Sequence, residues 1–242
     1  MKCKNCNTEL SRDFCPNCGQ RASINKVTFK ETFQDFIDVI FSVNAPLFLT
    51  LKLLVVNPGK LFREYLSGRR KTYYKPVPFF ILTALIMIFT RSMLDYDPMS
   101  NMVDMGGESI NESLINSAGV FMSKNINNII FSFVFAFAVF VKLFFSRSYS
   151  FAEYIAVSFY VIGFYLFFTS VLIFGLQYLK PQFRMVPFIL MFFYVMYALI
   201  SFLKKKNAFT ILKIIMVYFL SVIFFMIIGY GTSLLIVWLK FK

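Results

Sequence analysis

Five long stretches of this chain carry no charged residue and are almost wholly apolar, and no other feature constrains the fold as strongly. The stretches are Pro76–Thr90, Asn125–Val141, Tyr154–Leu179, Met185–Leu203 and Ile214–Leu239. A helix that crosses the hydrocarbon core of a bilayer, about 30 Å thick, needs about 20 mostly apolar residues. The last three stretches are long enough unaided. The sequence therefore predicts an all-α, polytopic membrane protein.

The first two stretches, of 15 and 17 residues, need their flanks to span the bilayer. Tyr73 and Tyr74 suit the interface before the first stretch, and the long side chain of Arg91 can reach the interface from within an extended helix. Lys142 can do the same near the end of the second stretch. The five predicted spans are then about 73–94, 125–145, 154–179, 185–203 and 214–239.

The composition excludes a water-soluble enzyme for most of the chain. Hydrophobic residues make up 58% and charged residues 15%, against about 45–50% and about 25% in soluble domains. The chain has no histidine, so the commonest general base and the imidazole metal ligand are both absent. No nucleophile–base pair and no phosphate-binding loop stand out, and we predict no catalytic residue.

Lys and Arg are distributed unevenly between the two sides that five spans define. With the N-terminus in the cytoplasm, cytoplasmic segments hold 19 basic residues and external segments hold six. Cytoplasmic loops of membrane proteins are enriched in Lys and Arg. No apolar secretory segment follows Met1, so the first span is expected to act as an uncleaved insertion signal. The prediction is a cytoplasmic N-terminus and an external C-terminus.

One alternative adds a sixth span over Phe36–Val56, which is 21 residues long. It contains Asp38, Pro46 and Lys52, and it would place the basic residues that follow it outside the cell. We favour a short helix from Pro46 to about Val56. At about 16 Å this helix cannot cross the core, so it either lies in the interface or re-enters the membrane.

All four cysteines lie in the first 18 residues, as two CxxC pairs: Cys3 with Cys6, and Cys15 with Cys18. Each pair can wrap a tight turn around one metal ion, and four thiolates complete the tetrahedral coordination of a structural Zn²⁺. A cytoplasmic location disfavours disulfides, and a redox CxxC motif lacks its usual βαβ surroundings here. We predict that residues 1–21 form a small zinc ribbon.

The zinc ribbon is not expected to bind nucleic acid. Residues 1–21 carry a net charge of +2, which four thiolates and one Zn²⁺ bring close to zero. Phe14 is the single aromatic residue of the head, so the head offers no platform on which bases could stack. A protein-interaction or fold-capping role fits these properties better.

Residues 22–75 are predicted to form amphipathic and interfacial helices ahead of the transmembrane domain, residues 76–242. Thr28 and Glu31 have the spacing of a capping box, and the apolar residues that follow fall on one helical face up to about Asn44. The second short helix is the one that begins at Pro46.

A third short helix is predicted between Asn57 and Gly68. Asn57 supplies an N-cap, Pro58 suits the first helical position, and Gly68 suits a helix C-terminus. Six basic residues lie in or after this helix, and they can attract anionic lipid headgroups at about 1 kcal/mol each. A topology signal alone is the other interpretation. The six are Lys60, Arg63, Arg69, Arg70, Lys71 and Lys75.

The connection between the first two spans, residues 91–124, is predicted to be an external, solvated loop. Its acidic residues could alternatively bind a divalent cation. They are Asp95, Asp97, Asp104, Glu108 and Glu112.

The run from Asn57 to Phe80 reads NPGKLFREYLSGRRKTYYKPVPFF, and it follows a head that reads CKNC and then FCPNCGQ. This combination resembles a bacterial family of integral membrane proteins known only as a domain of unknown function. The resemblance covers about residues 1–90. It implies a zinc ribbon followed by several spans in the bacterial inner membrane, and it implies no activity. In fold alone, five spans behind amphipathic helices are also similar to Yip-type membrane proteins.

Two functions from different classes follow from these features. We favour a membrane-embedded adaptor or scaffold, whose ribbon binds a cytoplasmic or membrane protein partner. The alternative is a transporter or lipid-handling protein with the ribbon as a structural cap, and an unrecognised membrane enzyme is the third. Transport is disfavoured because Arg91, Lys142 and Glu153, the ionisable residues nearest the spans, lie near predicted ends.

Overall fold

A computed structural model describes residues 8–9, 13–17, 46–70, 72–94, 110–176 and 186–240 of this chain. The chain divides into two compact units, Met1–Ser42 and Val43–Lys242. The helix predicted to begin at Thr28 lies outside the described residues.

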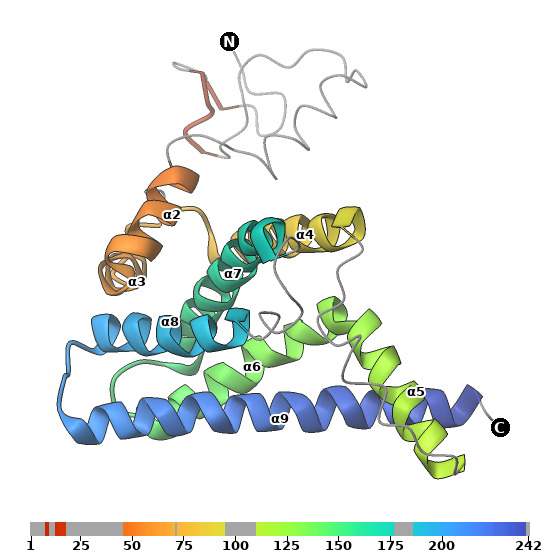
Figure 1. The fold of residues 1–242 in the computed structure, drawn as a ribbon. Helices are drawn as coiled ribbons and strands as arrows, with labels where there is room; N and C mark the ends of the chain where they lie inside the picture. Colours follow the sequence, from red (N-terminus) through yellow and green to blue (C-terminus); the bar gives the residue numbers. More distant parts are fainter. Residues whose placement is uncertain are drawn as a thin grey trace. The chain divides into compact units, whose positions relative to one another are not determined.

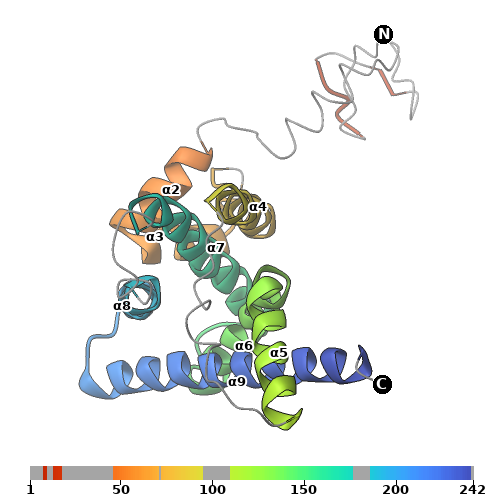
Figure 2. The same ribbon diagram turned by 45° about the vertical axis from the view of Figure 1, so that its right-hand side comes forward.

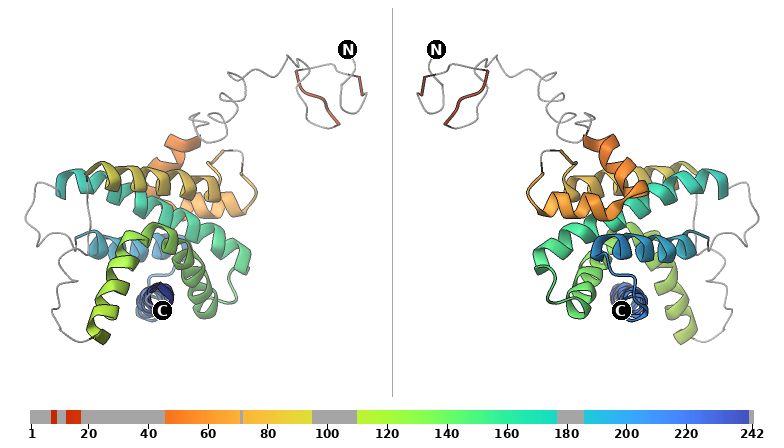
Figure 3. Two further views of the ribbon diagram at one scale, coloured as in Figure 1. Left: turned by 90° about the vertical axis from the view of Figure 1, so that its right-hand side faces the viewer. Right: turned by 90° about the vertical axis from the view of Figure 1, so that its left-hand side faces the viewer.

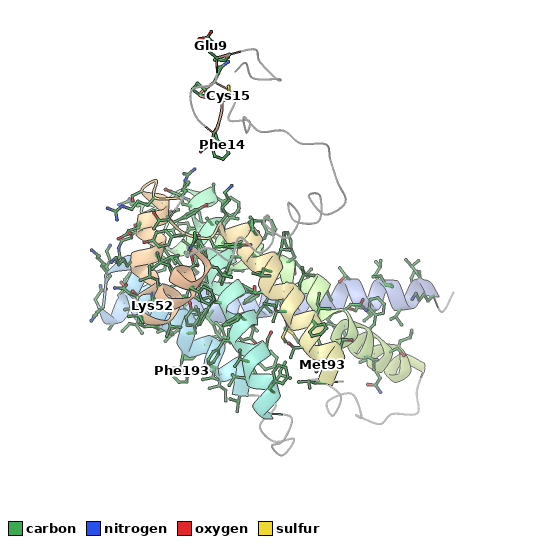
Figure 4. The ribbon with its side chains drawn as sticks, turned by 90° about the horizontal axis from the view of Figure 1, so that it is seen from above. Glu9, Phe14, Cys15, Lys52, Met93 and Phe193 are labelled. Carbon is green, nitrogen blue, oxygen red and sulfur yellow. The ribbon has the colours of Figure 1, made fainter. Side chains whose placement is uncertain are left out.

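The described part of the first unit is a short segment around Cys15. Glu9 and Phe14 each take part in a single β-bridge, and a turn follows at Pro16 and Asn17. The Asn17 side-chain amide donates a hydrogen bond of 3.5 Å to the hydroxyl of Thr8. Cys15 is 3% exposed, and Figure 4 labels it beside Phe14.

Every regular element that the structure describes in the second unit is an α-helix (Figure 1). The elements are α2 (Pro46–Val56), α3 (Pro58–Leu66), α4 (Pro76–Leu94), α5 (Ile110–Lys124), α6 (Ile126–Phe144), α7 (Phe151–Leu176), α8 (Val186–Leu203) and α9 (Ala208–Lys240).

Four of these helices are long and apolar enough to cross a membrane: α4, α7, α8 and α9. They lie where the first, third, fourth and fifth spans were predicted. The second predicted span forms helix α6, whose described apolar part is the shorter stretch Ile129–Phe144. Such helices are those of an integral membrane protein. Helix α9, with 33 residues, is about 50 Å long, which exceeds the hydrocarbon core.

Helix α7 lies at the centre of the second unit and contacts α4, α6 and α8. Helix α4 runs alongside it (Figures 1 and 3). Gly163 of α7 permits this approach, because a Cβ there would lie 2.9 Å from the ring of Phe79. Tyr160, Val161 and Ile162 are buried in the same stretch of α7, so the core is built around this helix.

Residues 110–124 form helix α5, so the prediction of a solvated loop was wrong there. Glu112 lies in this helix, and residues 95–109 lie outside the described part. The helix crosses α9 (Figures 1 and 2), and the buried Met122 fills the space that Gly229 leaves, where a Cβ would lie 2.7 Å from the Met122 Cε. Burial against α9 stabilises a helix whose own sequence is too polar to read as a span.

Candidate functional site

The short helices before the first span form a firmly attached structure, which we call the elbow and define as Pro46–Leu66. Helix α2 begins at Pro46 and ends at Val56, which confirms the predicted short helix. The described residues begin at Pro46 here, so the first ten residues of the alternative sixth span fall outside them.

The predicted boundaries of the third short helix are also confirmed. The side-chain oxygen of Asn57 accepts a hydrogen bond from the backbone N–H of Lys60 at 3.0 Å, and Pro58 is the first residue of α3. Gly68 follows the helix with a φ of 109°, a left-handed conformation that glycine adopts without strain.

The C-terminal end of α2 is held by tyrosines of α8. The Tyr194 hydroxyl donates to the Leu54 carbonyl at 3.3 Å, and the Tyr197 hydroxyl lies 3.1 and 2.6 Å from the carbonyls of Val55 and Val56. The last carbonyls of a helix have no partner within it. Two side chains from a helix about 140 residues away therefore satisfy the end of α2.

Ser201 of α8 contacts the start of α3 in the same way. Its hydroxyl accepts from the backbone N–H of Gly59 at 3.1 Å and donates to the Asn57 side-chain oxygen at 3.2 Å. A Cβ on Gly59 would lie 2.1 Å from the Ser201 carbonyl oxygen, which no real side chain can do. Position 59 therefore requires glycine for α3 and α8 to approach this closely.

Arg63 completes the junction from the other direction. Its guanidinium Nη1 donates to the Ser201 and Phe202 carbonyls at 2.5 and 2.9 Å, at the C-terminal end of α8. The positive charge of Arg63 at this end also interacts favourably with the negative pole of the α8 dipole. Each of the two elements thus supplies side chains to the unsatisfied backbone of the other.

The remaining predicted headgroup residues differ in what they contact. Lys60 and Arg69 form ion pairs with Glu64 at 4.0 and 3.3 Å. The Arg70 guanidinium lies 6.0 Å from the centre of the Tyr65 ring, and Lys75 is exposed. Lys71 lies outside the described residues. A lipid role for this cluster stays a prediction.

Glu64 has one further partner, the buried Tyr73, whose hydroxyl donates to it at 2.5 Å. This hydrogen bond holds the pKa of Glu64 below its ordinary value of 4.5, with smaller contributions from Arg69 and Lys60. Burial, together with the bond to Glu64, raises the pKa of Tyr73 to about 12. The Tyr73–Glu64 hydrogen bond therefore holds the segment between α3 and α4 against α3.

Contacts bring two other loops to the same end of the second unit as the elbow. The Phe202 ring, next to Ser201, packs 5.6 Å from Phe62 of the elbow and 4.6 Å from Tyr149 in the loop before α7. Both loops carry exposed basic residues. They are Arg147, Lys204, Lys205 and Lys206. These are the loops that the charge distribution assigned to the cytoplasm along with residues 1–75.

Of the predicted zinc ligands, Cys15 alone lies within the described residues. It is buried, whereas Cys3, Cys6 and Cys18 are not described. The described part of the chain holds no group of three metal-ligating side chains. The zinc site therefore stays a prediction.

Sequence reasoning missed the partners that α8 supplies. Tyr194, Tyr197 and Ser201 were assigned to a span with no further role, and nothing local distinguishes them from other polar residues of apolar helices. The hydroxyl of Tyr160, which donates to the Tyr74 carbonyl at 2.5 Å, was missed for the same reason.

Comparison with known proteins places the elbow in a recognised segment. A family model described as a protein of unknown function (DUF3667) matches residues 45–88, which comprise the elbow, the linker after it and the first part of α4. The chain is thus similar to an uncharacterised family over this part. No curated protein and no solved structure matches the chain.

Proposed function

We propose that this protein is an adaptor embedded in the bacterial inner membrane, whose cytoplasmic zinc ribbon binds a protein partner. Five spans, comprising α4, α6, α7, α8 and α9, anchor it. The N-terminus lies in the cytoplasm and the C-terminus lies outside. The elbow joins the ribbon to the spans.

The polarity of the buried side chains carries this proposal. Among the residues that the structure describes, every polar or charged residue that is buried as a whole, tyrosine aside, is a serine or threonine. Arg91, near the end of α4, is half-buried with one buried guanidinium nitrogen, and it donates to the Ser123 carbonyl at 3.3 Å. Transporters and ion pumps use ionisable side chains inside the membrane to bind or relay charge. Arg91 lies in the last turn of α4 and not in the middle of the helix, so the bundle is suited to holding other parts in place.

Four of the buried hydroxyls are also hydrogen-bonded within their own helices. Each of these four hydroxyls donates to the backbone carbonyl four residues earlier in its helix, at 2.6 to 2.8 Å. They belong to Ser158, Ser170, Ser221 and Ser233. Hydroxyls bonded in this way are not aimed at a substrate. Aromatic rings such as Phe62, Tyr160 and Phe79 pack between the helices.

The described part of the head fits the zinc ribbon. Cys15 is buried and opens the turn that leads to Cys18, and the Asn17–Thr8 hydrogen bond joins the neighbourhoods of the two CxxC pairs. Cys3, Cys6, Cys15 and Cys18 would hold one Zn²⁺ as four thiolates. Four protein ligands leave no open position, so the metal would stabilise the fold of the ribbon and would not act as a catalyst.

Lipid handling is the second candidate, and one buried group favours it. The Thr169 hydroxyl of α7 is buried and finds no hydrogen-bond partner among the described residues. An unsatisfied hydroxyl inside a bundle is a place where a bound polar group could sit.

Affinity purification from crosslinked membranes tests the adaptor proposal. The wild type is compared with Cys15→Ser and with Asp13→Asn, an exposed and non-ligating neighbour. We expect a protein partner that is captured by the wild type and by Asp13→Asn and is lost with Cys15→Ser, while protease protection shows that the spans still insert. Identical partners for all three proteins would contradict the proposal. A retained lipid without any protein partner would favour the second candidate.

A further inference from the structure

The backbone at the end of α2 is completed by protein groups. The carbonyls of Leu54, Val55 and Val56 accept hydrogen bonds from the two tyrosine hydroxyls of α8. The Asn57 N–H donates to the Leu53 carbonyl at 2.8 Å. The next free amide, that of Gly59, is taken up by Ser201. Water would satisfy such groups at a membrane surface, whereas in hydrocarbon the protein itself must do so.

The positions of these contacts along α8 indicate how deep in the membrane they lie. The 18 residues of this helix, Val186–Leu203, are about 27 Å long, so α8 has no length to spare when it crosses a core of about 30 Å. Three exposed lysines, 204–206, follow it and belong at the interface. Leu203 therefore marks the boundary of the hydrocarbon on that side.

The two tyrosines that hold α2 lie well inside this boundary. Tyr197 is six residues before Leu203, or about 9 Å along the axis, and Tyr194 is nine residues before it, or about 14 Å. Side chains of a helix lean toward its N-terminus, which for α8 is the direction away from the lysines. The carbonyls of Leu54, Val55 and Val56 thus lie at the level of the acyl chains.

The outward face of α2 has the composition that acyl chains require. Phe48, Val55 and Val56 are between 59% and 65% exposed, although the helix is held tightly on its other side by the buried Thr50 and Leu54. Such a face is unfavourable in water and favourable in lipid.

Lys52 is the one charged residue on this exposed face, and Figure 4 labels it on α2. A lysine stem of four methylene groups can lie along apolar surroundings while its ammonium reaches the headgroups. One snorkelling lysine is compatible with a helix embedded in a single leaflet.

We propose that α2 is embedded in the acyl layer of the leaflet next to Lys204–Lys206, with Phe48, Val55 and Val56 in contact with lipid chains. This chooses between the two placements that the sequence left open for this helix. The inference rests on α8 crossing the membrane and is independent of the zinc ribbon.

Depth-dependent quenching of tryptophan fluorescence in reconstituted vesicles tests the placement. The chain has a single tryptophan, Trp238, so the Trp238→Phe variant has no tryptophan fluorescence of its own. One tryptophan is then introduced by Val56→Trp or, as a second probe of the same face, Val55→Trp. Phe193→Trp, at an α8 side chain that is 61% exposed, reports the middle of the membrane, and Lys205→Trp reports the interface. Phe193 is labelled in Figure 4.

The vesicles carry quenchers either at the lipid headgroup or in the middle of the acyl chain. We expect the ratio of chain to headgroup quenching for both elbow probes to approach that of Phe193→Trp and to exceed that of Lys205→Trp by about twofold or more, given the depth difference along α8. Ratios equal to that of Lys205→Trp, with strong quenching by acrylamide in the water, would overturn the placement. Equal ratios for the two α8 probes would also overturn it, because α8 would then fail as a depth marker.

Discussion

Two contacts in the second unit bring helices together by different means. Where α4 meets α7, Gly163 admits the ring of Phe79, and the Ser170 hydroxyl lies 2.8 Å from the Leu166 carbonyl of its own helix and 3.4 Å from the Met87 sulfur of α4. Where the elbow meets α8, hydroxyls and a guanidinium donate across the contact to backbone carbonyls. A thioether is a weak acceptor, so the first contact depends mainly on shape, and the second depends on directed hydrogen bonds to backbone carbonyls.

The difference follows from which part of each helix takes part. The backbone inside a helix is already hydrogen-bonded, so a contact between helix middles needs only complementary surfaces. Helix ends leave carbonyls without partners, and these can be satisfied by one particular arrangement of donors. The elbow packs its helix ends against α8, which fixes its position more specifically than apolar packing alone.

The largest effect is expected at Gly59. Gly59→Ala would place a Cβ 2.1 Å from the Ser201 carbonyl oxygen, and both atoms belong to helix backbones that cannot move independently. We expect a loss of about 3 kcal/mol or more in the free energy of unfolding. Thermal unfolding in detergent, followed by size-exclusion chromatography, measures this loss.

Gly231→Ala is the matched control, because nothing lies within 4 Å of the added Cβ in helix α9. It should leave the stability unchanged or raise it by up to about 1 kcal/mol, the gain in helix propensity. Equal stabilities for Gly59→Ala and Gly231→Ala would show that α3 and α8 do not approach as described.

Arg63→Ala should have the next largest effect. It removes both hydrogen bonds that the Arg63 Nη1 donates at the C-terminal end of α8, to the carbonyls of Ser201 and Phe202. Hydrogen bonds of charged groups contribute about 1.5–3 kcal/mol each, so a loss of about 2–3 kcal/mol is expected in the same unfolding measurement. Arg70→Ala, which removes an exposed guanidinium near the Tyr65 ring, should cost less than about 1 kcal/mol. The reverse order would mean that Arg63 acts at the lipid surface and not at α8.

Tyr197→Phe sharpens the comparison between the two kinds of hydroxyl. It deletes a hydroxyl shared by the carbonyls of Val55 and Val56 and keeps the ring, so we expect a loss of about 1–2 kcal/mol. Ser221→Ala deletes a hydroxyl that is bonded within its own helix, where the carbonyl of Val217 keeps its helical role, and it should cost less than about 1 kcal/mol. Similar losses for both variants would show that hydroxyls donating across the contact contribute no more to stability than hydroxyls bonded within their own helix.

The smallest effect concerns the ionisation of Tyr73. Its pKa is raised from an ordinary value of 10 to about 12, so the folded protein holds this proton more tightly than the unfolded chain does. The stabilisation is complete below pH 10 and is lost as the pH rises toward about 12. The ultraviolet titration of the wild type minus that of Tyr73→Phe should show a tyrosine with a midpoint near 12, and a midpoint near 10 would contradict the burial of Tyr73 together with its pairing with Glu64.

Glu64 responds at the opposite end of the pH scale. Its pKa is lowered from 4.5, so its contribution to stability is present above that value and declines as the pH falls through the lower, folded-state pKa. Tyr73→Phe removes the largest cause of this shift, and the acid limb of the stability curve of the variant should therefore be shallower.

The features that sequence reasoning predicted are local ones. Asn57 and Pro58 fix the start of α3 through groups within three residues of each other, and Gly68 fixes the turn after it. Four of the five predicted spans are long apolar helices. A run of about twenty apolar residues is typical of a membrane-spanning helix, so this signal is local to the run itself.

The features that it could not predict depend on distant partners. Tyr197 is 141 residues from Val56, and no pattern in a helix rich in aromatic residues distinguishes this tyrosine from one that faces lipid. Helix α5 was missed because polar residues surround the buried Ala118 and Met122, of which Met122 packs against Gly229 of α9. No local pattern distinguishes Arg63 from its exposed basic neighbours, because its hydrogen-bond partner Ser201 is 138 residues away in the sequence.

The adaptor proposal depends first on the head, and the zinc content of the full-length protein tests that head most directly. The protein is purified without added metal, and zinc is counted by mass spectrometry beside the number of thiols that react in the native state. We expect one zinc ion per chain with the four cysteines protected, and loss of both in Cys15→Ser but not in Asp13→Asn. A metal-free wild type with four reactive thiols would contradict it.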